Sequence, residues 1–170
     1  MGEEYVEKNP LLYFVNHNDQ ELNRLVTEGR NREFKDFYGD SREKVPDPAD
    51  EETFSRSKLS WDVESEREKT ILNYYRELLR LRKTLPALKA PDKKNIRVKT
   101  QDNMLIAERA EEMDVILCIF NFENNDKEIL IDPAHASTLY TILDSSDRKW
   151  PGPGSLINPV VKKGEKIVVN

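Results

Sequence analysis

The pattern of apolar and polar positions is most regular in residues 65–88, where apolar side chains recur every three or four residues between charged ones. This spacing is typical of an amphipathic helix. Ser65 and Glu68 have the spacing of a capping box, and Pro86 lacks the backbone donor that a longer helix needs. The pattern predicts a helix whose apolar stripe requires a partner surface. The stripe consists of Ile71, Tyr74, Tyr75, Leu78, Leu79, Leu81 and Leu85.

Residues 1–64 show little regular pattern. Residues 11–15 form an apolar block, after which Asp19 is expected to cap a short helix that ends near Gly29. A stretch rich in proline and acidic residues then disfavours helix until about Asp50, where a turn or short helix is expected. Because irregular segments of this length are uncommon inside self-contained domains, we expect a neighbouring surface to hold this one.

From residue 96 onward the period changes to two, which predicts short antiparallel strands forming a sheet or sandwich. Residues 115–120 are apolar on both faces, which favours a central strand, and residues 124–126 supply a turn after it. Residues 144–154 contain two prolines and two glycines and are expected to form a loop outside any strand ladder. The expected strands are residues 96–98, 104–107, 115–122, 129–131, 139–143 and 167–169.

The change of period predicts an α+β fold with two domains, residues 1–90 and 91–170, joined between residues 88 and 95. Charged residues make up 35 % of the 170-residue chain and hydrophobic ones 37 %, a balance that supports one ordinary core. The net charge of −5 has both signs interspersed, so we expect no nucleic-acid partner. The chain has no long apolar run and an acidic start, which predicts a cytoplasmic protein without a membrane partner.

Few residues suggest chemistry by themselves. Because Cys118 is the one cysteine in the sequence, an intramolecular disulfide and a zinc site made of cysteines are excluded. The two histidines, His17 and His135, are too far apart in the sequence to match the spacing of metal ligands. No glycine pattern cradles a phosphate and no serine lies in a nucleophile turn, so no metal, cofactor or catalytic residue is predicted. Trp150, in the 144–154 loop, either stacks on a sugar ring or packs over a sheet edge, which is the commoner role.

A specific resemblance lies in the order and spacing of the blocks MGEEY, NPLLYFVNH, LVTEGRNREF, VPDPADEETFSRSKLSW and YYRELLRLRKTLPAL. Together they resemble the C-terminal part of the maltooligosyltrehalose trehalohydrolases, a family of α-amylase superfamily glycoside hydrolases. The resemblance covers residues 1–90. The remaining residues are similar to the amylase C-terminal β-sandwich in general character, through IFNFENNDKEILID and KKGEKIVVN.

The resemblance implies that residues 2–5 end the eighth strand of a (β/α)8 barrel and that residues 65–88 form its last helix. An antiparallel β-sandwich of the amylase C-terminal type would follow. The catalytic carboxylates of the family would lie upstream of Met1, and a complete barrel needs about 250 residues. The NHNDQELNR segment superficially resembles a family motif that carries an aspartate, but it follows GEEY rather than preceding it, so Asp19 is not predicted to be catalytic.

The resemblance also implies a sugar subsite. Barrel residues at the carboxyl end of a strand face the active site, so Glu3, Glu4 and Tyr5 are expected to bind substrate, with His17 and Asp19 as further candidates. The alternative for Glu3 and Glu4 is a solvated acidic start of the chain.

The expected function is that of a C-terminal portion of a trehalose-releasing α-glycosidase. The family reaction is hydrolysis of the α-1,4 bond next to the trehalose unit of maltooligosyltrehalose, so a maltooligosaccharide-type glycan is the expected partner. We expect the chain alone to be inactive. Two alternatives are a stand-alone carbohydrate-binding or assembly β-sandwich module, and the product of a degenerate reading frame. Without a barrel, an apolar patch would be covered by a homodimer through the exposed helix face or by rearrangement of the N-terminal arm.

Overall fold

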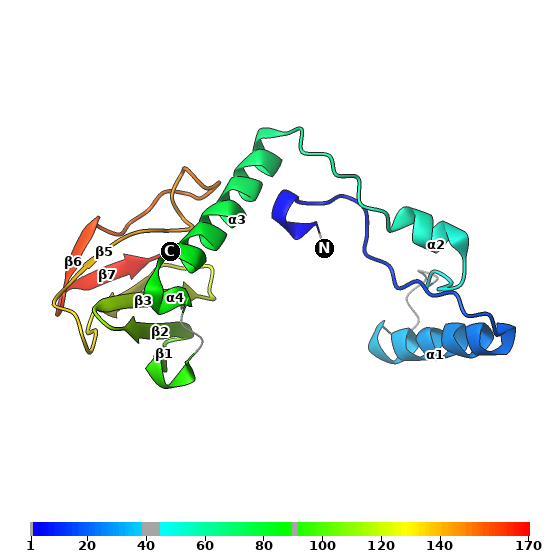
Figure 1. The fold of residues 1–170 in the computed structure, drawn as a ribbon, viewed down its shortest axis with the longest axis horizontal. Coiled ribbons are helices and arrows are strands. Elements are labelled where there is room, and N and C mark those ends of the chain that lie inside the picture. Colours follow the sequence, from blue (N-terminus) through cyan, green and yellow to red (C-terminus); the bar gives the residue numbers. More distant parts are fainter. Residues whose placement is uncertain (1, 39–44, 90–91) are drawn as a thin grey trace. The chain divides into compact units, whose positions relative to one another are not determined.

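The computed structural model describes residues 2–38, 45–89 and 92–170 and divides the chain into two compact units, Met1–Glu64 and Ser65–Asn170. The first unit is helical and irregular, whereas the second combines helices with antiparallel strands (Figure 1). The predicted α+β class is confirmed.

The first unit contains a 3-10 turn, η1 (Glu3–Tyr5), and two helices, α1 (Gln20–Tyr38) and α2 (Glu51–Arg56). As predicted, Asp19 caps α1: its Oδ1 accepts hydrogen bonds from the backbone N–H groups of Glu21 (2.9 Å) and Leu22 (3.3 Å). Asp50 caps α2 in the same way by accepting from the N–H of Glu52, so the helix begins where the acidic, proline-rich stretch ends.

The predicted end of the first helix near Gly29 is wrong, because α1 continues through that residue to Tyr38. A glycine inside a helix costs only about 1 kcal/mol, which local contacts can offset. Arg30 and Glu33 form an ion pair at 3.0 Å across the turn after Gly29, and the Arg30 guanidinium lies over the Phe34 ring. These contacts support the helix beyond the glycine.

Polar contacts, rather than a large apolar core, connect the segments of the first unit. The backbone oxygen of Asp47 accepts a hydrogen bond from Thr53 Oγ1 (2.7 Å), and its carboxylate accepts one from Thr27 Oγ1 (2.8 Å). The N–H of Val15 donates to the oxygen of Pro48 (2.9 Å). Of the Leu, Ile and Val side chains described in this unit none is buried, whereas Tyr5 is only 4 % exposed.

The second unit begins with helices α3 (Glu66–Thr84) and α4 (Pro86–Lys89), followed by the 3-10 turn η2 (Lys93–Asn95). The predicted capping box is present: Ser65 Oγ accepts from the N–H of Glu68 (3.2 Å), and the Glu68 carboxylate accepts from the N–H of Ser65 (3.0 Å). Pro86 occupies the first position of α4, where its missing N–H has no helical acceptor to lose.

Seven strands follow, all in antiparallel pairs. The first three form one sheet in the order β1-β2-β3, β4 pairs with β7, and β5 pairs with β6. Each of the six predicted runs overlaps one of these strands, and β6 is an additional strand that the pattern did not predict, because its apolar run is short. The strands are β1 (Ile96–Gln101), β2 (Met104–Glu111), β3 (Asp114–Asn121), β4 (Lys127–Leu130), β5 (Thr138–Tyr140), β6 (Val160–Lys162) and β7 (Lys166–Val169).

The prediction of residues 115–120 as a central strand is wrong, because β2 occupies the centre and β3 lies at the edge of its sheet. Both faces of β3 are nevertheless partly buried. Leu117 and Ile119 pack against the buried core, while Ile116 and Cys118 line a cavity on the helix-facing side. Helix α4 contacts β2 and β3, and Arg109 Nε donates to the backbone oxygen of Ala87 in α4 (2.8 Å). Burial on two faces therefore explains the continuous apolar run.

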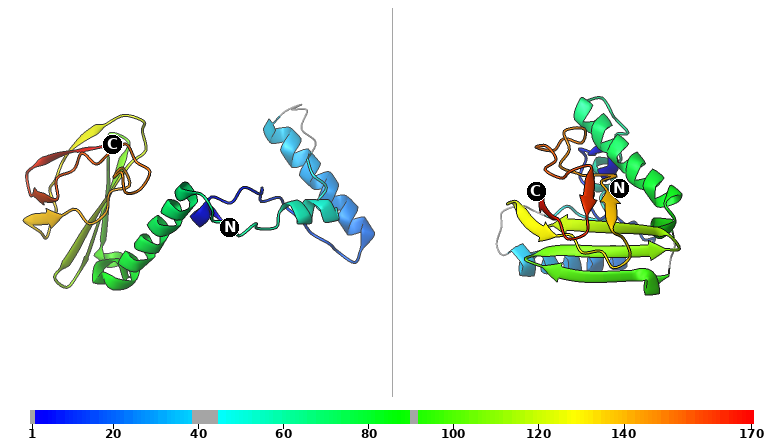
Figure 2. Two further views of the ribbon diagram at one scale, coloured as in Figure 1. Left: turned by 90° about the horizontal axis from the view of Figure 1, so that it is seen from above. Right: turned by 90° about the vertical axis from the view of Figure 1, so that its left-hand side faces the viewer.

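The core of the second unit collects buried side chains from several strands. Figure 2 shows the ribbon of these strands from two further directions. Residues 123–125 form a bend after β3, which overlaps the turn predicted at residues 124–126, but this bend does not connect paired strands, because β4 pairs with β7. As predicted, residues 144–154 lie outside the ladders. The buried core cluster consists of Met104, Ile106, Ile129, Ile131, Val161, Ile167 and Val169.

The two compact units meet between Glu64 and Ser65, so α3 and α4 belong with the strands by contact. The domain boundary predicted from the sequence lies between residues 88 and 95, where the helical period changes to the strand period. This boundary stays a prediction about domain organisation.

Replacing Ser65 with Ala removes the acceptor of the capping box, and we expect the second unit to lose about 1 kcal/mol of unfolding free energy. Ser65→Asp keeps an oxygen acceptor and is expected to unfold near the wild-type midpoint. Urea unfolding followed by far-ultraviolet circular dichroism measures both variants. Equal midpoints for Ala and Asp would contradict a stabilising role for the box.

Candidate functional site

The carboxylate of Glu7 lies at the centre of a hydrogen-bond network in the first unit. It accepts from the N–H of Asn9 (2.9 Å), the N–H of Ser60 (2.8 Å) and the hydroxyl of Tyr5 (3.1 Å). The N–H of Lys8 (2.9 Å) and the hydroxyl of Ser60 (3.1 Å) add two further donors. One side chain therefore ties the turn that contains η1 to a segment 53 residues later in the chain.

These donors stabilise the ionised form of Glu7 and lower its pKa to about 2. The N–H of Asn9 is the largest cause; burial acts in the opposite direction, and Ser60 and the Tyr5 hydroxyl lower the pKa further. A carboxylate with so many donors and so low a pKa is a poor general acid or base near neutral pH. The geometry gives Glu7 a positioning role.

The turn that Glu7 closes has an unusual backbone. Gly2 adopts a φ of 87°, and a Cβ placed there would lie 2.5 Å from Glu7 Cβ and 3.3 Å from Leu59 Cδ2. Val6, after η1, has a φ of 60°, a left-handed conformation that is rare for a β-branched residue. Only glycine fits at the start of this turn without displacing the Glu7 side chain.

Trp61 lies beside this network. Its ring stacks on the buried ring of Tyr5 with centroids 6.1 Å apart and 26° between the planes, yet the residue is 73 % exposed. Its backbone φ is 60°, and a non-glycine residue held there costs about 1–3 kcal/mol. The neighbouring chain is fixed by the Ser60 bonds to Glu7 and by Asn9 Nδ2, which donates to the oxygen of Lys58 (2.7 Å).

Three residues predicted from the sequence to bind sugar lie in η1. Glu3 is exposed, and the bond from its own N–H is the largest cause that lowers the pKa of its carboxyl group. Glu4 is half-buried. Tyr5 is buried, which raises the pKa of its hydroxyl, and its bond to Glu7 raises that pKa further. The structure brings Tyr5 into the Glu7 network, leaves Glu3 exposed and half-buries Glu4.

His17 and Asp19 lie just before α1, and each makes local hydrogen bonds that are separate from the Glu7 network. The N–H of His17 donates to Asn23 Oδ1 (3.0 Å), and Asn23 Nδ2 donates back to the His17 oxygen (3.0 Å). Asp19 caps the helix. These contacts explain both positions by local structure, and their roles in sugar binding stay predictions.

Trp150 is 8 % exposed in the 144–154 loop of the second unit. Its ring meets the Tyr74 ring edge-on at 5.2 Å and 66°, and Lys149 Nζ lies 4.5 Å from its centroid. This geometry favours the packing role over sugar stacking, since the ring is already covered. Sugar binding by Trp150 stays a prediction.

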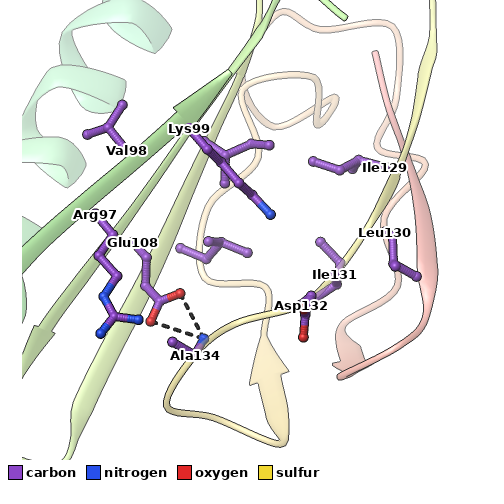
Figure 3. Close-up of a pocket in the computed structure, with 11 residues that line it drawn as sticks. Arg97, Val98, Lys99, Glu108, Ile129, Leu130, Ile131, Asp132 and Ala134 are labelled. Atoms are coloured by element: carbon purple, nitrogen blue, oxygen red, sulfur yellow. Dashed lines mark hydrogen bonds between the residues drawn. The ribbon is translucent and has the colours of Figure 1, made fainter. Parts of the chain in front are cut away.

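Three recesses in the second unit are lined by described residues. The first, of about 180 Å³, contains Glu108, whose carboxylate accepts from the N–H of Ala134 at 2.9 and 3.2 Å (Figure 3). That contact fixes the loop after β4 to β2. The second, of about 400 Å³, is lined by Trp150, Lys149 and polar side chains of α3. The third, of about 410 Å³, lies between α3 and β3 and has mostly apolar walls. Cys118 lines it, and burial raises the pKa of its thiol, which favours the packing role expected for this residue.

No family model matches the chain. Individual sequences do match it. The chain is similar to malto-oligosyltrehalose trehalohydrolases. It is 42 % identical to the one from Deinococcus radiodurans over 96 residues, which is 56 % of this chain and 16 % of that protein. It is 44 % identical to the one from Rhizobium sp. strain M-11 over 89 residues, 52 % of this chain and 15 % of that protein. The resemblance seen in the sequence blocks is confirmed.

A solved structure extends the comparison to nearly the whole chain. A protein from Salmonella typhimurium, provisionally assigned as an α-amylase, has a TM-score of 0.66 and 31 % identity over 99 % of this chain and 27 % of its own. The chain thus spans about a quarter of that protein and no more than 16 % of the trehalohydrolases named above. Both comparisons support a relation to glycoside hydrolases of the α-amylase type.

Neither a metal centre nor a membrane span emerges from the part of the chain that the structure describes. Within residues 2–38, 45–89 and 92–170, no group of three or more His, Cys, Asp and Glu side chains has the arrangement of a metal site. None of the helices in these ranges has the length and apolar character needed to cross a bilayer.

Sequence reasoning missed Glu7 and did not choose Trp61 as a site residue. A glutamate followed two residues later by asparagine is not a distinctive motif, and the bond to Ser60 spans 53 residues. For Trp61, the signal was an aromatic residue in a segment with little apolar periodicity. Because no apolar periodicity assigns such a tryptophan to a core, the sequence gives a reason to expect that its ring is exposed.

Replacing Glu7 with Gln removes the ionised acceptor, and we expect the Tyr5 and Trp61 arrangement to loosen at neutral pH. Because folding lowers the pKa of Glu7, its contribution is present above the unfolded value of about 4.5 and is lost as the pH falls toward about 2. The wild-type Trp61 indole signal should therefore change across this window in a nuclear magnetic resonance titration.

In Glu7→Gln this step should be absent, while Glu51→Gln, at an exposed position of α2, should titrate like the wild type. A wild-type titration that Glu7→Gln reproduces would contradict the positioning role.

Proposed function

We propose that this chain forms the C-terminal portion of a trehalose-releasing α-glycosidase and is non-catalytic by itself. The observation that carries the proposal is the 42 % identity to a malto-oligosyltrehalose trehalohydrolase over a segment that makes up only 16 % of that protein. The reaction is hydrolysis of the α-1,4 bond next to the trehalose unit of maltooligosyltrehalose. The rest of the enzyme supplies the catalytic carboxylates.

In this proposal the first unit and α3 complete the end of a (β/α)8 barrel, and the strands β1–β7 form a C-terminal β-sandwich. The match to the Salmonella typhimurium protein over 99 % of this chain supports an amylase-type arrangement. Paired strands with a shared apolar core are compatible with a sandwich. A glycine at position 2 and the turn after it then end the eighth barrel strand.

The hydrogen bonds of two carboxylates in the first unit, Glu7 and Asp19, argue against a catalytic role for either. Retaining glycosidases need two carboxyl groups about 5–5.5 Å apart on a rigid frame, one of them able to exchange a proton. Glu7 is occupied by several donors, and Asp19 caps α1. Glu3 and Glu4 are proposed to contact sugar hydroxyls, and Tyr5, whose own hydroxyl binds Glu7, is proposed to contribute to the subsite through its ring. His17 and Asp19 are further candidates.

The exposed apolar side chains support a covering partner. In α3, Leu79 is 55 % exposed, and a group of large apolar residues in the first unit is similarly uncovered. We propose that the rest of the parent enzyme covers these surfaces and that a second copy covers them when the chain is alone. The group consists of Leu11, Tyr13, Phe14, Leu22, Leu25 and Phe54.

The alternative of a stand-alone carbohydrate-binding or assembly module relied on Trp150 and neighbouring aromatic residues. Trp150 lines a recess with polar side chains of α3, but its ring packs against Tyr74 and is only 8 % exposed, which favours packing over sugar stacking. The trehalohydrolase portion is therefore the function that the observations support best.

The deciding experiment measures trehalose release from a maltooligosyltrehalose. The purified chain is assayed alone and after mixing with a Deinococcus radiodurans trehalohydrolase that lacks the segment matching this chain. We expect no release by either part alone and measurable release by the mixture, because the missing barrel end is then restored.

A pair of glycine variants controls for the geometry. Gly2→Ala places a Cβ against Glu7 and should reduce recovery strongly, whereas Gly29→Ala, where no atom lies within 4 Å of the added Cβ, should recover as well as the wild type. Release by the chain alone would contradict the non-catalytic role, and a mixture without activity would contradict the proposed partnership.

A further inference from the structure

The exposure of Trp61 is unexplained by the packing of the first unit. Tryptophan is highly buried on average, and its large apolar surface favours transfer out of water. Trp61 is 73 % exposed, whereas Trp150, the other tryptophan, is 8 % exposed. The second unit thus uses its tryptophan for packing, and the first unit presents its tryptophan to solvent.

The ring is presented in a defined position. Trp61 has a left-handed backbone (φ 60°), which an unconstrained aromatic residue rarely adopts. The residue before it is bound through its N–H and hydroxyl to Glu7, and the N–H of Asp62 after it donates to Ser60 Oγ (3.3 Å). Strained backbone conformations of this kind cluster at ligand-binding sites, where the surrounding structure maintains them.

The ring of Tyr5 packs against one face of the Trp61 indole. Tyr5 is buried, its hydroxyl is bound to Glu7, and its ring stacks on the indole at a centroid distance of 6.1 Å. The part of the indole that Tyr5 leaves uncovered faces solvent. A flat apolar side chain whose backbone is held in place and whose other face rests on a buried ring is suited to stack on a flat ligand.

We propose that Trp61, supported by Tyr5, is a stacking platform for one glucose ring of an α-1,4-glucan. The axial C–H bonds of a pyranose form an apolar face that matches an indole, whose N–H can donate to a sugar hydroxyl. Glu4, half-buried and directly before Tyr5, places a hydroxyl acceptor on the same turn. The choice of glucose as the sugar rests on the proposed function, whereas the platform rests on the geometry.

The test uses the full chain labelled with ¹⁵N and maltotetraose as the probe, with the indole N–H signals of both tryptophans followed by nuclear magnetic resonance. Maltotetraose should shift the Trp61 signal in a saturable manner and leave the Trp150 signal unchanged. Sorbitol, which has hydroxyls but no ring, should shift neither signal. Equal effects of the two compounds, or no shift with maltotetraose, would overturn the proposal.

Variants separate stacking from folding. Trp61→Ala should weaken maltotetraose binding roughly tenfold or more in calorimetry, and Trp61→Tyr, which keeps an aromatic face, should retain most of it. Trp150→Phe should bind as the wild type does. Unfolding midpoints identify any variant that fails to fold. If Trp61→Ala does not fold, the maltotetraose affinity of Trp61→Tyr decides the outcome. Wild-type affinity in Trp61→Ala would overturn the proposal.

The result is distinguishable from failure of the proposed function. Recovery of trehalose release on mixing, without any maltotetraose effect on Trp61, would overturn the platform and leave the proposed function standing. A Trp61 shift caused only by the added enzyme portion would assign the ring to the contact between the parts, and would also overturn the platform. Maltotetraose binding without recovered release would support the platform and contradict the trehalohydrolase role.

Discussion

The shortage of buried apolar surface in residues 1–64 is the constraint on which the candidate site depends. Tyr5 is buried, but no described Leu, Ile or Val side chain of this unit is. Hydrogen bonds must then provide the geometry that a core would otherwise provide, and Glu7 and Asp47 provide much of it. Such bonds contribute only about 1 kcal/mol each, so the arrangement relies on several acting together.

This organisation links position to function. A carboxylate that accepts five hydrogen bonds is unsuited to proton transfer, yet it can hold Tyr5 and the Ser60 backbone in fixed places. The exposed indole of Trp61 is then presented without a hydrophobic core beneath it. The unit therefore positions groups at a surface by hydrogen bonds, which is the geometry on which the proposed function relies.

The second unit obeys a different constraint. Its strands β2 to β7 contribute side chains to a shared core, and α4 covers the opposite side of β2 and β3. Glu108 and Arg109, neighbours in β2, point to opposite faces and bind the backbone of Ala134 and Ala87. The period of two therefore places one polar anchor on each side of the strand, connecting the loop after β4 to one face and α4 to the other.

The sequence by itself determined the elements whose causes are local. The Ser65 capping box, the Asp19 cap and the strand periodicity depend on residues within a few positions of one another, and the relation to trehalohydrolases was legible in the sequence blocks. Only the tertiary structure decided that β3 lies at a sheet edge, that Glu7 binds Ser60, and that Trp150 is buried while Trp61 is exposed. The physical reason is that these outcomes depend on contacts between segments far apart in the sequence, whereas periodicity and capping patterns involve only residues a few positions apart.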